Sequence, residues 1–265
     1  MSVSSKRLLI IAGSDSGGGA GFQADIKTSS AFGVYAMTAI TAVTVQDTQR
    51  VHSAQLISPK IVRDQIRVCL NDIGADAIKI GMLGSAEIVD TVAVALKRYP
   101  RSIPVVIDPV MISTGGKRLL ARDAIETFKL KLLPLATLIT PNLPEARAIT
   151  GMRGTERKAV EAAGRKLIQM GSRAALIKGG HATKETVDDV LVWEGGVEIY
   201  AFPRIRTRHT HGTGCVLSTA IACGLAQGLL LPLAVGRARE FVQHAIQSAP
   251  GLGRGHGPLN LIGKR

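Results

Sequence analysis

Short apolar runs alternate with segments of helical periodicity along most of this chain of 265 residues, and this alternation restricts the fold more than any other feature. Runs such as "LLIIA", "AIKI" and "PVVID" are typical of strands that are buried on both faces of a sheet. The segments between them carry helix signals, for example Ser58 before Pro59 at the start of one segment and Gly74 at its end. The alternation predicts right-handed βαβ units in an α/β fold, with residues 1–265 forming a single domain whose central, mostly parallel sheet has helices on both faces.

The expected elements follow from the same patterns. Turn residues Glu194, Gly195 and Gly196 between two strand-like runs predict a hairpin late in the chain. The predicted strands cover residues 7–13, 35–46, 51–58, 77–81, 104–108, 137–140, 174–180 and the hairpin 187–205. The predicted helices cover residues 21–33, 58–74, 85–99, 122–134 and 155–171, with further helices after residue 212.

Composition places the chain among globular proteins, since 46% of the residues are hydrophobic and 20% are charged. The three cysteines are odd in number and scattered, which argues against a disulfide framework and favours a reducing compartment. The start "MSVSSKRLLIIAGSD" has only a short apolar run before glycine and aspartate, so it shows no secretory signal. These features predict a cytoplasmic protein.

The net charge of +13 raises the question of nucleic acid as a partner. However, the basic residues are spread through the chain and aromatic residues make up only 3%, too few for the stacking platforms that bind single strands. A basic surface also attracts anionic small molecules. We therefore expect an anionic small-molecule substrate and no nucleic-acid partner.

An uncharged stretch from Gly214 to Gly236 is long enough to span a bilayer. Gln227, Gly228 and Pro232 interrupt it, so the pattern favours a buried helix, a short turn and the start of another helix. No membrane partner is expected.

Several predicted strands are followed by polar or glycine-rich loops, which is where ligands bind in sheets of this kind. The loop at 12–25 lacks the Gly-Lys-Ser/Thr ending of a P-loop and does not fit the dinucleotide spacing, so alone it is equally explained as a flexible turn. Asp25 could be exposed or could help the helix to start. Gln46 could hold the edge of a heteroaromatic amidine through paired hydrogen bonds, or could be a solvated loop residue.

Three later loops carry groups that suit magnesium or phosphate. Asp108 ends an apolar strand and could hold Mg²⁺, or could merely begin a turn before a proline. Asn142 and Glu145 could reach hydrated Mg²⁺, and they also fit a helix capping box. Lys178, in "IKGGH", could reach a phosphate or be an ordinary loop lysine.

The stretch "THGTGC" at 210–215 places a cysteine where a helix is expected to begin. A helix start favours anions and lowers the pKa of a thiol, so this stretch is either an anion site with a base beside it or a tight turn into a core helix. His209 and His211 are too few to argue for zinc, and Cys223 is expected to be a core side chain. The backbone N–H groups that would converge on an anion belong to Gly212, Thr213, Gly214 and Cys215.

Together these loops supply what phosphoryl transfer needs, namely an anion site, candidate magnesium ligands, a cation and a proton acceptor. The segments "IAGSDSGGGAGFQADIKT", "IGML", "DPVM", "TPNLPEA", "KGGH" and "THGTGC" occur in one order from about Leu8 to "GRGHGPLN" near the end. In this set and order the chain resembles the hydroxymethylpyrimidine and phosphomethylpyrimidine kinases of thiamin biosynthesis, within the ribokinase-like superfamily. The resemblance implies ATP and Mg²⁺ as cofactors, phosphorylation of 4-amino-5-hydroxymethyl-2-methylpyrimidine and of its monophosphate, and a homodimer.

The resemblance also implies a role for each motif. Cys215 would be the base within the anion hole of Gly212, Thr213 and Gly214. Many members carry Pro-Ser after the aspartate of the first loop, where this chain has Ser16 and Gly17. Two alternatives stay open: a pyridoxal kinase on the same scaffold, and a non-catalytic pyrimidine-binding protein. The remaining implied contacts are Gln46, Gly13, Asp25, Met82 and Val110 for the pyrimidine, Asn142, Glu145, Lys178 and Asp108 for ATP, and Glu145 and Asp108 for the metal.

Overall fold

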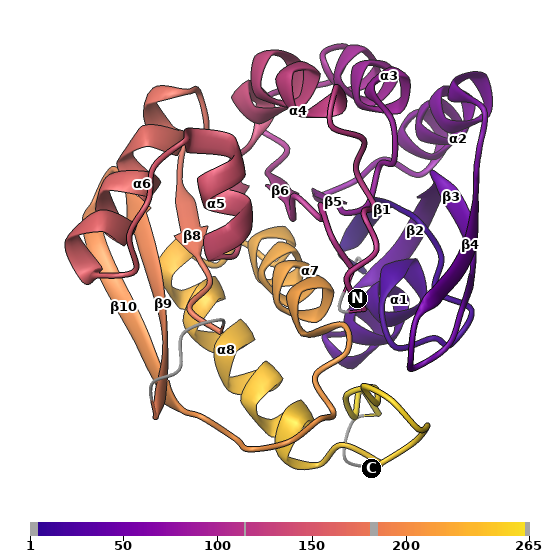
Figure 1. The fold of residues 1–265 in the computed structure, drawn as a ribbon. Coiled ribbons are helices and arrows are strands. Elements are labelled where there is room, and N and C mark those ends of the chain that lie inside the picture. Colours follow the sequence, from indigo (N-terminus) through magenta and orange to yellow (C-terminus); the bar gives the residue numbers. More distant parts are fainter. Residues whose placement is uncertain (1–4, 114, 181–184, 263–265) are drawn as a thin grey trace.

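A single eight-stranded sheet forms the centre of the molecule in the computed structural model, which describes residues 5–113, 115–180 and 185–262 (Figure 1). The strand order is β10-β9-β8-β7-β6-β5-β1-β2, and the pairs from β2 to β8 are all parallel. The last two strands are antiparallel and form the predicted hairpin. The mostly parallel α/β sheet is therefore confirmed. Its strands are β1 (Arg7–Ala12), β2 (Tyr35–Ile40), β5 (Ala77–Ile80), β6 (Val105–Ile107), β7 (Leu138–Ile139), β8 (Ala175–Ile177), β9 (Thr186–Trp193) and β10 (Gly196–Pro203).

The run at 35–46, predicted as one strand, divides at Thr41. Its second half, β3 (Ala42–Gln46), leaves the main sheet and pairs with β4 (Val51–Leu56) in a separate two-stranded sheet. Thr41 stands at the branch, since its N–H donates to Ala12 of β1 and its carbonyl accepts from Ile57. The periodicity of the run could not reveal this division, because both halves are strands.

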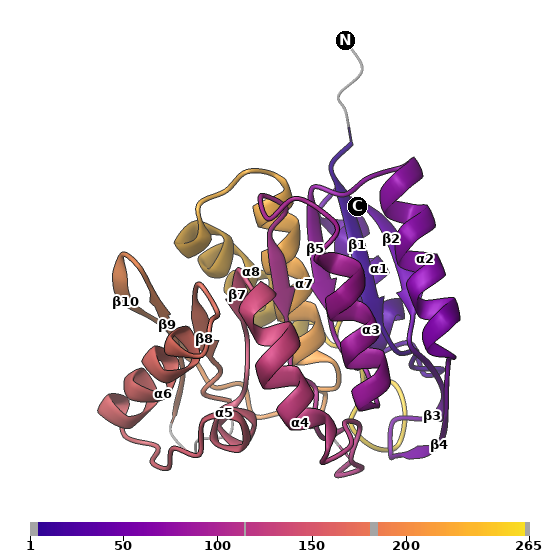
Figure 2. The same ribbon diagram turned by 90° about the horizontal axis from the view of Figure 1, so that it is seen from above.

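Helices cover both faces of the sheet, as Figures 1 and 2 show. Alternate residues of the central strands face opposite layers: Leu8, Ile10 and Ala77 pack in one cluster with α1, α7 and α8, while Ile78 and Ile80 pack against the other helices. This follows from the period of two along a strand. The helices are α1 (Gly21–Ala31), α2 (Pro59–Asp72), α3 (Ala86–Leu96), α4 (Ala124–Thr127), α5 (Leu143–Thr150), α6 (Arg157–Gln169), α7 (Thr213–Ala226) and α8 (Leu231–Gln247).

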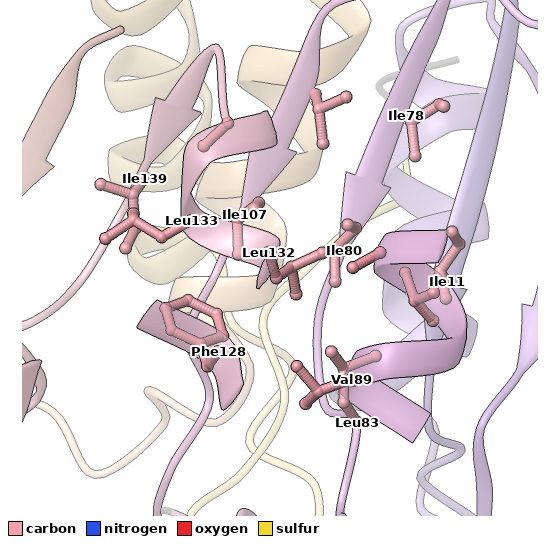
Figure 3. Close-up of a cluster of buried hydrophobic side chains, with 14 of the residues drawn as sticks. Ile11, Ile78, Ile80, Leu83, Val89, Ile107, Phe128, Leu132, Leu133 and Ile139 are labelled. Carbon is pink, nitrogen blue, oxygen red and sulfur yellow. The ribbon is translucent and has the colours of Figure 1, made fainter. Parts of the chain in front are cut away.

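The helix expected at 122–134 is irregular. After α4 the chain forms a π-helical turn over Phe128–Leu132 and a 3₁₀ turn over Leu133–Leu135. Figure 3 shows the consequence, with Phe128, Leu132 and Leu133 pointing into the same cluster as the strand residues beside them. The proline at 134 lacks an N–H donor, which prevents a regular helix from continuing.

Glycines end the first two helices as the sequence predicts. Gly33 and Gly74 have φ angles of 67° and 75°, in the left-handed region that favours glycine. The uncharged stretch near residue 220 is divided between α7 and α8 at a turn. Among the residues that the structure describes, no helix has the length and apolar character needed to cross a membrane.

Candidate active site

The motif loops meet at one edge of the sheet because they follow parallel strands. Residues after β1, β5, β6, β7 and β8 carry the candidate groups, and the carboxyl ends of these strands share one edge. Direct contacts confirm the meeting of the later loops: Asn142 pairs with Lys178 in a parallel bridge, and Nζ of Lys178 lies 2.7 Å from Oδ1 of Asp108. The start of α7 reaches the same place. A Cβ atom placed on Gly214 would lie 3.0 Å from Nζ of Lys178 and 3.4 Å from Oδ2 of Asp108.

The start of α7 is shaped by glycine. Gly212 is the residue that precedes the helix, with φ of 82°, and a Cβ atom there would lie only 1.9 Å from the carbonyl oxygen of Gly19. Only glycine allows the two loops to pass this closely. The first turn of a helix offers N–H groups without helical acceptors, so the backbone of Gly214 and Cys215 suits an anion. The N–H of Thr213 donates to the carbonyl of Thr210 at 3.3 Å, and the places of Gly212 and Thr213 in the anion hole stay predictions.

Two helices begin beside the thiol of Cys215. Thr213 opens α7, and the backbone N–H of Gly21, the first residue of α1, donates to the sulfur. Despite this, the expectation of a lowered thiol pKa is wrong in the free protein: burial raises the pKa of Cys215 to about 11, Lys79 opposes the rise, and Asp25 and Asp108 add to it. The helix start by itself would lower the pKa of the thiol, but the fold also partly shields the thiol from water and places two carboxylates near it.

The capping box predicted for Asn142 and Glu145 is present. The side chain of Asn142 accepts from the N–H of Glu145 at 2.9 Å, and Oε2 of Glu145 accepts from the N–H of Asn142 at 2.8 Å. The cap uses the Oδ1 atom of Asn142 and the Oε2 atom of Glu145. It holds the Glu145 carboxylate in a fixed, buried position near Lys178 and Asp108.

The charges of Glu145, Asp108 and Lys178 together favour the binding of an added cation. Burial raises the pKa of Glu145 to about 7; Lys178 lowers it, while Asp108 raises it further. Burial works against the charge on Lys178, but Asp108 and Glu145 hold its pKa above the usual value. Lys178 pairs with Asp108, and the Glu145 carboxylate lies near enough to interact with the same ammonium, so an added divalent ion would be stabilised. Within the described residues no three His, Cys, Asp or Glu side chains are arranged as a metal cage, and magnesium usually takes one or two carboxylates together with phosphate oxygens. Glu145 and Asp108 thus fit a magnesium ion that arrives with a nucleotide.

The residues expected around the ring lie in the loops after β1, β5 and β6 and at the end of β3. Gly13 and Met82 are neighbours, since a Cβ atom on Gly13 would lie 3.0 Å from the Met82 sulfur. Gln46 ends β3, and its Nε2 lies 3.3 Å from Nε2 of His211. Val110 lies two residues beyond Asp108 and is half-buried, with its N–H donating to the Asp108 carbonyl. Gln46 is not a solvated loop residue, and the roles of all four at the ring stay predictions.

The sequence alone suggested that Asp25 is exposed or helps α1 to start. The structure shows neither, because Asp25 is fully buried and lies beyond the first turn of the helix. Its side chain has no exposed surface, Oδ2 lies 2.6 Å from Nζ of Lys79, and Oδ1 accepts from Thr219 at 2.7 Å. Its predicted contact with the pyrimidine stays a prediction. The Lys79 partner was missed, although a single lysine inside the apolar strand "AIKI" is the kind of signal that could have found it.

Asp15 and His211 were also missed as a pair. Oδ2 of Asp15 lies 2.7 Å from Nε2 of His211, and the carboxylate also accepts from the N–H groups of Gly17, Gly19 and Ala20. This pair joins the first loop to "THGTGC". Sequence separation hides it, and nothing in either motif alone predicts it. His181, the last residue of "KGGH", lies outside the described residues.

Comparison with known proteins agrees with this geometry. A family model described as phosphomethylpyrimidine kinase matches residues 15–260. The hydroxymethylpyrimidine/phosphomethylpyrimidine kinase of Streptomyces coelicolor is 46% identical, covering 96% of this chain and 93% of that one. The crystal structure of phosphomethylpyrimidine kinase from Clostridium difficile superimposes with a TM-score of 0.81 and 40% identity, over 91% of this chain and 99% of that one.

A second structural relative has a different name. An ADP complex of Bacillus subtilis pyridoxal kinase superimposes with a TM-score of 0.89 and 35% identity, covering 97% of both chains. The ribokinase-like fold and kinase class implied by the motifs are confirmed, since both structures and the sequence relative are kinases on this scaffold. The match to the family model over most of the chain and the identity to its curated relatives decide the assignment: this chain belongs to the phosphomethylpyrimidine kinase family.

Proposed function

We propose that this protein transfers the γ-phosphoryl group of ATP to the hydroxymethyl group of 4-amino-5-hydroxymethyl-2-methylpyrimidine, and then phosphorylates the monophosphate to the diphosphate for thiamin biosynthesis. The observation that carries the proposal is the position of Gly214, where the first turn of α7 meets the ion pair of Lys178 and Asp108. An anion site, a cation and carboxylates at one edge of the sheet are the parts that phosphoryl transfer requires. We further propose that residues 1–265 act as one kinase domain.

The chain's own residues would divide the work as follows. Backbone N–H groups at Gly214 and Cys215 would bind the oxygens of the phosphoryl group, and Lys178 would approach the same group from β8. Asn142 and Glu145 would hold the nucleotide side of the site. A magnesium ion held near Glu145 and Asp108 would neutralise phosphate charge. Gln46, with Gly13, Asp25, Met82 and Val110, would orient the aminopyrimidine so that its hydroxyl faces the phosphoryl group.

Cys215 would accept the hydroxyl proton. As the thiolate, its sulfur takes the proton, the hydroxyl oxygen forms a bond to the γ-phosphorus, and the bond between that phosphorus and the ADP oxygen breaks. Because burial keeps the thiol protonated in the free protein, a proton must first leave to solvent. Turnover should therefore rise with pH.

Mass spectrometry of the products tests the proposal. Purified protein, ATP and magnesium are incubated with the hydroxymethylpyrimidine in one tube and with pyridoxal in another. Monophosphate followed by diphosphate of the pyrimidine would support both steps. Phosphate on pyridoxal alone would transfer the assignment to the alternative that the Bacillus subtilis relative raises. Binding of the pyrimidine without any transfer would leave the non-catalytic alternative.

We also propose a cytoplasmic homodimer. The support for the dimer is the resemblance to the family, together with apolar side chains that the small sheet leaves exposed: Val43, Val45 and Leu56 are exposed by 49%, 59% and 42%. Light scattering after size exclusion would measure the mass. A monomer at micromolar concentration would contradict the proposed dimer without affecting the kinase proposal.

A further inference from the structure

A charged pair is buried completely in the layer beneath the candidate active site. Nζ of Lys79 and Oδ2 of Asp25 lie 2.6 Å apart, and neither side chain has any exposed surface. Burying two charges costs free energy that well-packed apolar residues would not cost, so such a pair is weak support for a purely stabilising role. Lys79 is also the lone charged residue of the strand "AIKI". A function for the charge is the simpler explanation.

The position of the pair connects it to Cys215. Lys79 alternates along β5 with Ile78 and Ile80, which pack on the opposite layer, so its side chain lies on the side of α1 and α7. Asp25 belongs to α1 and accepts a hydrogen bond from Thr219 of α7 at 2.7 Å. Thr219 follows Cys215 by four residues and therefore lies one turn below it on the same face of the helix.

The ammonium of Lys79 also reaches the edge where the loops meet. A Cβ atom placed on Gly81 would lie 3.0 Å from Nζ. The next residue, Met82, is one of the candidate pyrimidine contacts. The Lys79 charge thus lies at the carboxyl end of β5, beside the loop that carries Met82.

Four charged groups act on the thiol from four different elements. Two are carboxylates, which oppose ionisation of the thiol, and two are ammonium groups, which favour it. Lys79 is first among the groups that lower the pKa of Cys215 against the effect of burial, and Asp25 acts in the opposite direction. The four are Lys79 from β5, Asp25 from α1, Asp108 beyond β6 and Lys178 beyond β8.

We propose that Lys79 and Asp25 form a positioning pair that sets how readily Cys215 ionises: the ammonium stabilises the thiolate from below, and the carboxylate holds that ammonium in place while limiting its effect. Lys79 keeps its proton throughout and touches no reacting atom. Charge balance is simple, since the thiol proton leaves to solvent and the thiolate later takes the proton of the substrate hydroxyl. The inference rests on the proposed role of Cys215 as proton acceptor.

The reactivity of the thiol tests the pair without any substrate. Cys69→Ser provides the background, because Cys69 is the other partly exposed thiol and Cys223 is buried. The rate of alkylation of Cys215 by iodoacetamide is measured from pH 6 to pH 10, with mass spectrometry to confirm the site. In this background we expect Lys79→Met to slow alkylation at pH 8 about tenfold and Asp25→Asn to accelerate it about tenfold, which corresponds to one pKa unit in each direction.

Opposite signs distinguish an electrostatic role from a structural one. Loss of packing or of a hydrogen bond would move both variants in the same direction, and that result, or unchanged rates in both folded variants, would overturn the inference. Thr219→Val is the matched control: it removes the hydrogen bond to Asp25 with little change in shape and no change in charge, and its rate should stay within about twofold of the background. A change as large as that of Lys79→Met would also count against the pair.

Two further measurements keep the test decisive. If Lys79→Met does not fold, the sign of the Asp25→Asn effect decides: faster alkylation supports the inference, and slower or unchanged alkylation refutes it. In active protein, the rise of kcat/KM with pH should shift to higher pH in Lys79→Met. Failure of the kinase proposal would appear as missing product in the unaltered protein, whereas the alkylation rates need neither ATP nor pyrimidine and would still report on the pair.

Discussion

The carboxylate of Asp15 and the imidazole of His211 meet at 2.7 Å, although 196 positions separate them along the chain. Asp15 lies in the loop after β1 and is 2% exposed, and His211 directly precedes the glycine before α7. The same carboxylate accepts three backbone N–H groups of its own loop. One side chain therefore fixes the shape of the first loop and attaches it to the anion site, while Gln46 approaches the same imidazole from β3.

Asp15→Asn should destabilise the protein by about 3 kcal/mol, because it removes one partner of a buried pair and presents an amide to N–H donors. Although burial opposes it, His211 and the backbone donors hold the pKa of Asp15 below its usual value. The stabilisation is thus present above about pH 4 and is lost as pH falls through the lowered pKa of the folded state. Urea denaturation between pH 3 and pH 7 would measure both effects. Asp47→Asn is the control, since Asp47 pairs with His52 at the surface; an equal cost there would contradict the prediction.

Cys215→Ala should leave the fold intact and reduce turnover by about 10² or more, since it removes the proposed proton acceptor. In the unaltered protein the thiol has a pKa of about 11, so the thiolate fraction, and with it kcat/KM, should rise about tenfold per pH unit between pH 7 and pH 9. Steady-state kinetics over this range would check both expectations. Near-normal turnover in the alanine variant, or a profile that is flat with pH, would remove Cys215 from the role of base.

Glu145→Gln separates the charge of this residue from its role in capping. Glutamine can still accept from the N–H of Asn142, so the capping box should survive. In the unaltered protein the pKa of about 7 means that a proton must leave before a cation binds, and the KM for magnesium-ATP should fall about tenfold from pH 6 to pH 8. In the variant the KM for magnesium-ATP should be higher and should hardly change with pH. Glu145→Ala is the comparison, since it should also lose about 1 kcal/mol of stability with the cap.

Ser16→Ala should weaken the pyrimidine site without affecting the chemical step. The Ser16 hydroxyl donates to the carbonyl of Gln46 at 2.7 Å and accepts from its N–H at 2.8 Å, so it holds the backbone of Gln46 from both sides. We expect the KM for the pyrimidine to rise about fivefold to tenfold while kcat changes less than twofold, corresponding to about 1 kcal/mol for the lost hydrogen bonds. A fall in kcat with an unchanged KM would assign Ser16 to a different role. Ser30→Ala, on the last turn of α1, is a surface control.

Much of the fold follows from the sequence because local patterns report directly on burial. Runs such as "PVVID" predict buried parallel strands, glycines at 33 and 74 predict helix ends, and the hairpin after residue 186 follows from its turn residues. The run at 35–46 is different. Its division at Thr41 depends on a hydrogen bond to Ala12, which no local pattern contains.

The candidate site divides in the same way, into features set by neighbouring residues and features set by distant ones. The sequence by itself determined the family, the order of the loops along parallel strands, and the capping box of Asn142 and Glu145, because each depends on residues that are close in the chain or on the common edge of a parallel sheet. Only the tertiary structure decided how strongly Cys215 holds its proton, and which partners Lys79 and His211 find. The physical reason is that burial and charge pairing depend on groups brought together from distant parts of the chain, and their effects on ionisation exceed those of the local helix start.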